Sequence, residues 1–72
     1  MVNTLNPKKL LNSKWTAVNP SQKEKHFLVT EVELDEDGII IHCLIEAVMT
    51  RRSISIDWRS LKNGDVWISG WR

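Results

Sequence analysis

The stretch "HFLVTEVELDEDGIIIHCLIEAVM", residues 26–49, contains two runs rich in β-branched residues on either side of the polar tetrapeptide "DEDG". Short apolar runs with period-two alternation, bounded by Asp and Gly, predict β-strands, and a short polar interruption between them predicts a hairpin. We therefore expect antiparallel strands at residues 26–34 and 39–49. This hairpin determines the fold class.

The register of the hairpin follows from its apolar residues. If Leu34 pairs with Ile39 around a loop at residues 35–38, the apolar residues of both strands share a face, whereas a shift of one residue sets the isoleucines beside glutamates. The favoured register predicts a core face made of Leu28, Thr30, Val32, Leu34, Ile39, Ile41, Cys43 and Ile45. It places Glu31 opposite His42 on the other face, near a patch of Phe27, Val29 and Leu44.

Further strands are expected on both sides of this hairpin. Residues 51–58, "RRSISIDW", extend it, with Ile54 opposite Ala47 and Trp58 level with Cys43. Residues 15–18 and 66–71 read as the first and last strands. The complete predicted core is Trp15, Leu28, Val32, Leu34, Ile39, Ile41, Cys43, Ile45, Ala47, Ile54, Ile56 and Trp58.

Two short helical segments have recognisable starts. Asn6 is a suitable N-cap with Pro7 at the first helical position, which predicts one helical turn through Leu11. Asp57 is a suitable cap for a 3₁₀ turn in "DWRSLK", before the turn "KNGD". We expect residues 1–5 to be disordered.

A chain of 72 residues has room for one domain, residues 1–72, with a core spanning about residues 13–71. Five short strands, tight turns and a 3₁₀ turn before the last strand predict an all-β fold. We interpret it as a small SH3-like or Tudor-like barrel. The alternative is an OB-like barrel, which normally has a helix between its third and fourth strands.

The charge distribution, the cysteine content and the absence of long apolar runs indicate where in the cell the protein is expected. The net charge is +1, yet residues 31–50 carry six acids and no Lys or Arg, while both flanking segments are basic. The lone Cys43 forms no internal disulfide, no apolar run is long enough to cross a membrane, and no signal-like segment opens the chain. The expected location is therefore the cytoplasm of a bacterium, without membrane association.

The sequence contains no convincing catalytic, cofactor or metal site. The acidic tip at residues 33–44 matches the start of an EF-hand loop, but Leu44 occupies the position of the required bidentate Glu. His42 and Cys43 are neighbours on a strand and point to opposite faces, so they form no dyad. Glycines are scattered, without a phosphate-binding loop. We expect a protein that is not an enzyme and needs no cofactor.

Aromatic and basic residues provide the remaining candidate site. Rings interleaved with guanidinium groups are typical of surfaces that contact RNA or protein partners. The candidate residues are Trp67, Trp71, Arg51, Arg52, Arg59 and Arg72. Strand parity puts Trp67 and Trp71 on one face, which is either the wall of the core or a contact edge, depending on which way Ile68 points.

Two hypotheses about the function follow from these observations. The first is a non-catalytic binding or adaptor module that contacts a protein or RNA partner through this Trp/Arg surface. The second is a structural or self-associating protein, in which the tryptophans form the core and a homodimer interface.

The segments "NPKKLLNSKWTAVNPSQKEKHFLVTEVE", "LIEAVMTRRSISIDWRSLKN" and the terminal "GW" resemble a family of small tryptophan-rich conserved hypothetical proteins of cyanobacteria and proteobacteria. The resemblance covers about residues 6–71, and Trp15, Trp58 and Trp71 are its most specific positions. It implies a short bacterial cytoplasmic protein. Because this family has no assigned activity, cofactor or substrate, the resemblance carries over no functional residues.

Overall fold

The structure, a computed structural model, describes residues 6–21 and 23–72. The strands are β1 (Lys14–Ser21), β2 (Glu24–Leu34), β3 (Ile40–Ala47), β4 (Ser53–Ser55) and β5 (Trp67–Ser69), with 3₁₀ segments η1 (Pro7–Lys9) and η2 (Trp58–Lys62). They form one antiparallel sheet in the order β4-β3-β2-β1-β5. The expected all-β fold is confirmed. The finer SH3-like or OB-like assignment stays an interpretation, with β4 and β5 at the two edges of the sheet.

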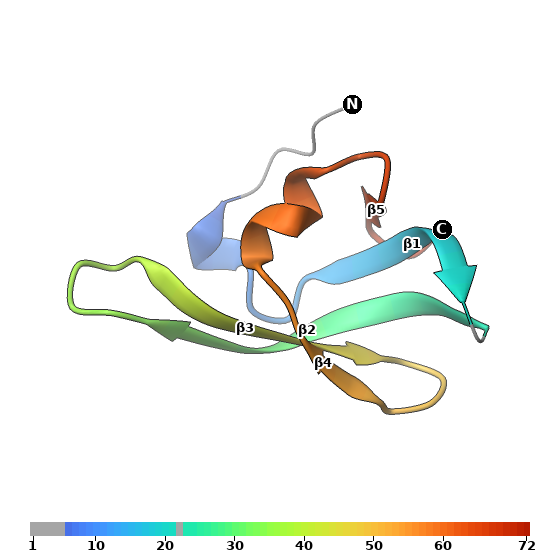
Figure 1. Cartoon of the computed structure of the whole chain (residues 1–72), viewed down its shortest axis with the longest axis horizontal. Helices are drawn as coiled ribbons and strands as arrows, with labels where there is room; N and C mark the ends of the chain where they lie inside the picture. Colours follow the sequence, from blue (N-terminus) through green and yellow to red (C-terminus); the bar gives the residue numbers. More distant parts are fainter. Residues whose placement is uncertain (1–5, 22) are drawn as a thin grey trace.

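The predicted caps are confirmed in detail. The Asn6 side chain accepts a hydrogen bond from the amide of Lys8 (3.0 Å), and Asp57 accepts one from the amide of Arg59 (3.0 Å). Figure 1 shows η1 and η2 on the same side of the sheet. Leu10, which follows η1, and Leu61 of η2 are both fully buried in the core cluster. The expected disorder of residues 1–5 lies outside the described residues.

The register of β2 against β3 differs from the expected one. Val29 pairs with Ile45 and Val32 pairs with Cys43, and an irregularity lies between Val29 and Glu31. Because one extra residue in a strand reverses its alternation, both valines face the core, although they are three positions apart. A second irregularity beside Leu34 pairs that residue with Ile40.

These irregularities change the composition of the core. The prediction that Leu34, Ile39 and Ile41 are core residues is wrong: they are 54%, 58% and 60% exposed. They lie at the tip of the β2–β3 hairpin, which projects beyond the segments that cover the sheet (Figure 1). Leu28 is only half-buried, since the neighbouring Val29 takes the inward position.

The rest of the predicted core is in or against the cluster. Trp15, Cys43, Ile45 and Ala47 are buried, and Val32, Ile54, Ile56 and Trp58 pack against them while partly buried. The buried apolar residues that the predicted core left out are Leu10, Phe27, Val29, Ile40, Leu61 and Trp67. Within the described residues no helix is long and apolar enough to span a membrane.

Candidate functional site: an apolar pocket between the sheet edges

A pocket of about 270 Å³ opens on the side of the sheet that carries the core. All five strands or the segments next to them contribute to it, including both sheet edges. Its lining residues are Ala17, Asn19, Pro20, Glu24, Phe27, Ile45, Arg52, Ile54, Ile56, Asp65, Val66 and Trp67. The pocket therefore lies where β4 and β5, the two edges of the sheet, face each other.

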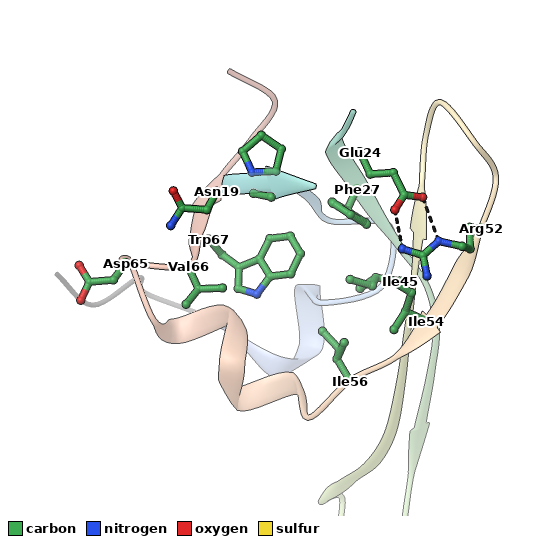
Figure 2. A pocket seen from close by; sticks show the side chains of 12 residues that line it. Asn19, Glu24, Phe27, Ile45, Arg52, Ile54, Ile56, Asp65, Val66 and Trp67 are labelled. Carbon is green, nitrogen blue, oxygen red and sulfur yellow. Dashed lines mark hydrogen bonds and ion pairs between the residues drawn. The ribbon is translucent and has the colours of Figure 1, made fainter. Parts of the chain in front are cut away.

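The inner wall of the pocket is aromatic and aliphatic. The rings of Trp67 and Phe27 meet edge to face, with centroids 5.1 Å apart. Both are at least nine-tenths buried. In Figure 2 the side chains of Ile45, Ile54 and Ile56 point toward the same space from the opposite side. This wall offers apolar surface held by packed side chains, as in pockets that are formed before a ligand binds.

An ion pair closes one side of the rim (Figure 2). Arg52 donates from Nε to Oε2 of Glu24 (3.1 Å) and from Nη2 to Oε1 (2.5 Å), and the Thr50 hydroxyl donates to Oε2 (2.5 Å). The Glu24 side chain is buried, whereas Arg52 is half exposed. This bidentate geometry connects the start of β2 to the β3–β4 turn and holds that side of the rim in place.

The surroundings of Glu24 lower its pKa strongly. The hydrogen bonds from Arg52 and then Thr50, with the positive charge of Arg52, lower the pKa from 4.5 to about 2, although burial opposes the change. Glu24 is therefore ionised at neutral pH. Because its charge is matched by Arg52, this side of the rim carries no net charge.

The far side of the rim carries Asn19 and Asp65, which point away from the centre of the pocket in Figure 2. Asp65 is held in a turn by a hydrogen bond from its amide to the side chain of Asn63 (2.9 Å). Polar groups thus stand at the mouth and apolar groups line the interior. This arrangement suits a guest with an apolar end and a polar backbone.

Trp67 and Trp71 do not share a surface. Gly70 adopts a positive φ of 85°, which ends the alternation on which the parity argument depended. Trp67 is 8% exposed, while Trp71 is 44% exposed and donates from Nε1 to the Phe27 carbonyl (3.0 Å). Ile68 is itself 37% exposed. Trp67 is thus part of the core, and Trp71 lies at the surface.

Two tryptophans have a lysine over the ring. The Nζ of Lys14 lies 4.8 Å from the Trp71 ring centroid, and the Nζ of Lys62 lies at the same distance from that of Trp58. Cation–π contact therefore already engages one face of each ring. Trp15 is buried.

The four candidate arginines are spread over the chain. Arg52 lines the pocket, Arg51 is exposed in the adjacent turn, and Arg59 contacts Asp57 (Nε to Oδ1, 3.4 Å). Arg72 donates from Nε to the Ser69 carbonyl (3.3 Å). Of the six candidate partner-binding residues, Trp67 and Arg52 line the pocket.

Cys43 and His42 occupy separate environments, as the strand parity predicts. Cys43 is buried, and burial raises the pKa of its thiol, which favours the unreactive protonated form. His42 contacts Glu31 (Nε2 to Oε2, 3.0 Å), the pair expected from the sequence, although the observed register sets His42 opposite Glu33. In the described residues no three His, Cys, Asp or Glu side chains converge to hold a metal.

Glu24 is the main site residue that the sequence interpretation missed. It is the only acid among residues 1–30, which otherwise carry five lysines. A lone acid in a basic segment is a signal of a specific pairing, but its partner Arg52 is 28 positions away. That pairing becomes visible only once the β3–β4 turn is placed next to the start of β2.

The fold and pocket together define a small all-β domain with a preformed apolar pocket. Residues 13–72 match the family model of the tryptophan-rich protein family DUF2389, so the chain belongs to this family. No curated protein and no solved structure matches the chain.

Proposed function

We propose that the protein is a non-catalytic binding module that recognises a protein partner by seating one apolar side chain in the pocket between β4 and β5. The observation that carries the proposal is the pocket itself, with the Trp67–Phe27 wall inside and the Glu24–Arg52 pair at its rim. Binding is the function that a pocket with this chemistry supports best, because its interior offers apolar contact.

The size of the pocket favours a side chain as the guest. Pockets for small-molecule ligands usually measure about 300–1,000 Å³, and a dry apolar cavity of about 150 Å³ holds one benzene ring. At about 270 Å³, this pocket accommodates a leucine, isoleucine or aromatic side chain with part of the adjoining backbone. The polar groups of Asn19 and Asp65 then stand where that backbone leaves the pocket.

The aromatic residues favour a protein partner over RNA. Single-stranded RNA is held by bases stacked on exposed rings. Here Trp15 and Trp67 are buried, and lysines of the same chain lie over the rings of Trp58 and Trp71. An apolar side chain of a protein partner can enter the pocket without exposing Trp15 or Trp67 and without moving the lysines that lie over Trp58 and Trp71.

Site-specific photo-crosslinking tests the proposal. We expect p-benzoylphenylalanine placed at Asp65, on the rim, to crosslink a protein partner in the cells that produce this protein. The additional substitution Ala17→Leu fills the pocket and should abolish this crosslink. Val18→Leu, at the exposed neighbouring position, is the matched control and should retain it.

Two outcomes would contradict the proposal. One is a protein crosslink that persists unchanged in the Ala17→Leu variant, since the contact would then not use the pocket. The other is a crosslinked species that ribonuclease removes, which identifies RNA as the partner. Circular dichroism of each variant verifies that the fold is retained.

A further inference from the structure

The tip of the β2–β3 hairpin carries a group of exposed apolar side chains. Leu34, Ile39 and Ile41 are each more than half exposed. The hairpin that carries them projects beyond the segments that cover the sheet (Figure 1). Single exposed apolar residues are common on any protein surface, whereas a group of them at one projecting end indicates a contact surface.

Hydrogen bonds hold the turn at this tip in one conformation. Oδ1 of Asp35 accepts hydrogen bonds from the amides of Asp37 and Ile39, at 2.9 Å each. The amide of Asp35 donates to the Ile39 carbonyl (2.9 Å), and Gly38 adopts the positive φ of 79° that the turn requires. Because the tip is ordered before any contact is made, it loses little conformational entropy when it binds.

The two ends of the molecule carry opposite charge. The hairpin tip is acidic, with Glu33, Asp35, Glu36 and Asp37. At the opposite end in Figure 1 lie the β1–β2 and β3–β4 turns, which the Glu24–Arg52 ion pair joins. The exposed cations at and beside these turns are Lys23, Lys25, Arg51 and Arg52. The pocket adjoins this basic end, because Arg52 is one of its lining residues.

We infer that the pocket between β4 and β5 receives the hairpin tip of a second copy of this chain. The anchor is Ile39, which lies at the turn and outside the pairing of β2 with β3. The hairpin points away from the pocket of its own chain (Figure 1), so the contact requires a second copy. The inference rests on the proposed function and names the partner of the same pocket.

Size and charge both support this occupant. A pocket of about 270 Å³ accommodates one aliphatic side chain with part of the adjoining backbone. The Glu24–Arg52 pair is neutral as a unit, and the exposed Arg51 next to it in the chain adds a positive charge on that side. Asp65 stands on the far side of the rim. An acidic tip is therefore oriented with its carboxylates toward Arg51 and away from Asp65.

The contact joins two different surfaces of the chain. Each copy offers one tip and one pocket, so every pair of copies leaves one tip and one pocket open. Further copies can add at both ends. We therefore expect the average mass in sedimentation to rise with protein concentration above the 8.4 kDa of one chain, and to pass that of a dimer.

Two complementary variants test the contact directly. The double substitution Leu34→Thr and Ile39→Thr removes the apolar tip and leaves the pocket, whereas Ala17→Leu fills the pocket and leaves the tip. Each variant alone should sediment as a monomer. Their equimolar mixture should form a dimer and nothing larger, because one pocket and one tip remain per pair. Leu11→Thr, at an exposed residue next to η1, is the matched control and should associate as the wild type does.

A charge variant keeps the inference testable if either of these variants fails to fold. Arg51→Glu, in an exposed turn, places a carboxylate beside the acidic tip and should weaken the association about tenfold or more. Lys8→Glu makes the same change of charge in η1 and should leave the association nearly unchanged.

The outcomes separate this inference from the proposed function. A wild type that stays monomeric at high micromolar concentration, or a mixture of folded variants that stays monomeric, would overturn the inference. If that wild type still binds N-acetyl-leucine amide in the pocket, the inference alone fails. If it binds no such amide, the proposed function fails as well.

Discussion

At the scale of single residues, Glu24 links the stability of the fold to the pocket. Its carboxylate is buried between Arg52 and Thr50, and all of its hydrogen bonds favour the ionised form. The pKa of about 2 in the folded protein compares with 4.5 for a free glutamate. A group whose pKa is lower in the folded than in the unfolded state stabilises the fold above the unfolded pKa. The contribution is lost as the pH falls through the folded value.

This linkage predicts the acid response of the protein. We expect the contribution of Glu24 to be complete above about pH 4.5 and to disappear progressively down to about pH 2. Glu24→Gln should therefore lower the urea midpoint at pH 7, and the difference from the wild type should shrink as the pH approaches 2. Urea denaturation curves across this range measure it. A difference that stays constant with pH would contradict the assigned charge pairing.

The four tryptophans illustrate how the environment of a residue decides its role. Trp15 and Trp67 are core residues, and Trp58 packs against the core while partly buried, with Lys62 over its ring. Trp71 is 44% exposed and has Lys14 over its ring. The sequence alternation predicted the burial of Trp15. It could not separate Trp67 from Trp71, because that separation depends on the positive φ of Gly70.

At the scale of elements, the irregularity in β2 determines which residues reach the core. It allows Val29 and Val32 both to face inward, while Ile41 near the hairpin tip stays exposed. In a strictly regular hairpin Val29 would face away from the core and Ile41 would face it, whereas Val32 would be on the core face in both registers. The register of β2 is therefore open to a direct test by substitution.

Threonine substitutions distinguish the two registers. Val29→Thr puts a hydroxyl into the core and should lower the free energy of unfolding by about 1–3 kcal/mol. Ile41→Thr, at a residue 60% exposed, should change it by less than about 0.5 kcal/mol. Chemical denaturation measures both. A larger loss from Ile41→Thr than from Val29→Thr would support the regular register and contradict the observed one.

Features of the fold that depend on neighbouring residues could be predicted from the sequence, and features that depend on distant segments could not. The caps Asn6 and Asp57 were predictable because a cap acts over two or three residues. The existence of the strands followed from local alternation. The irregularity near Val29 and the pairing of Glu24 with Arg52 were not predictable, since both depend on contacts between distant segments. The pocket was missed for the same reason, because its lining comes from all parts of the sheet.

At the scale of the whole molecule, the pocket lies between the two edges of the sheet, β4 and β5. On β5, the amide of Trp67 bonds to the Asn63 carbonyl and the carbonyl of Ser69 accepts a hydrogen bond from Arg72. The acidic β2–β3 hairpin projects away from this region (Figure 1). A partner that approaches the pocket therefore meets the rim formed by Glu24, Arg52, Asn19 and Asp65.

The central claim, that the pocket takes an apolar side chain, is tested most directly by an NMR titration with N-acetyl-leucine amide. Roughly 0.3 kcal/mol per non-hydrogen atom gives a dissociation constant in the low-millimolar range. We expect saturable amide shifts centred on Ala17, Ile54 and Trp67, with none from N-acetyl-glycine amide and none in the Ala17→Leu variant. Shifts that are equal for the two amides, or that persist in Ala17→Leu, would contradict the account.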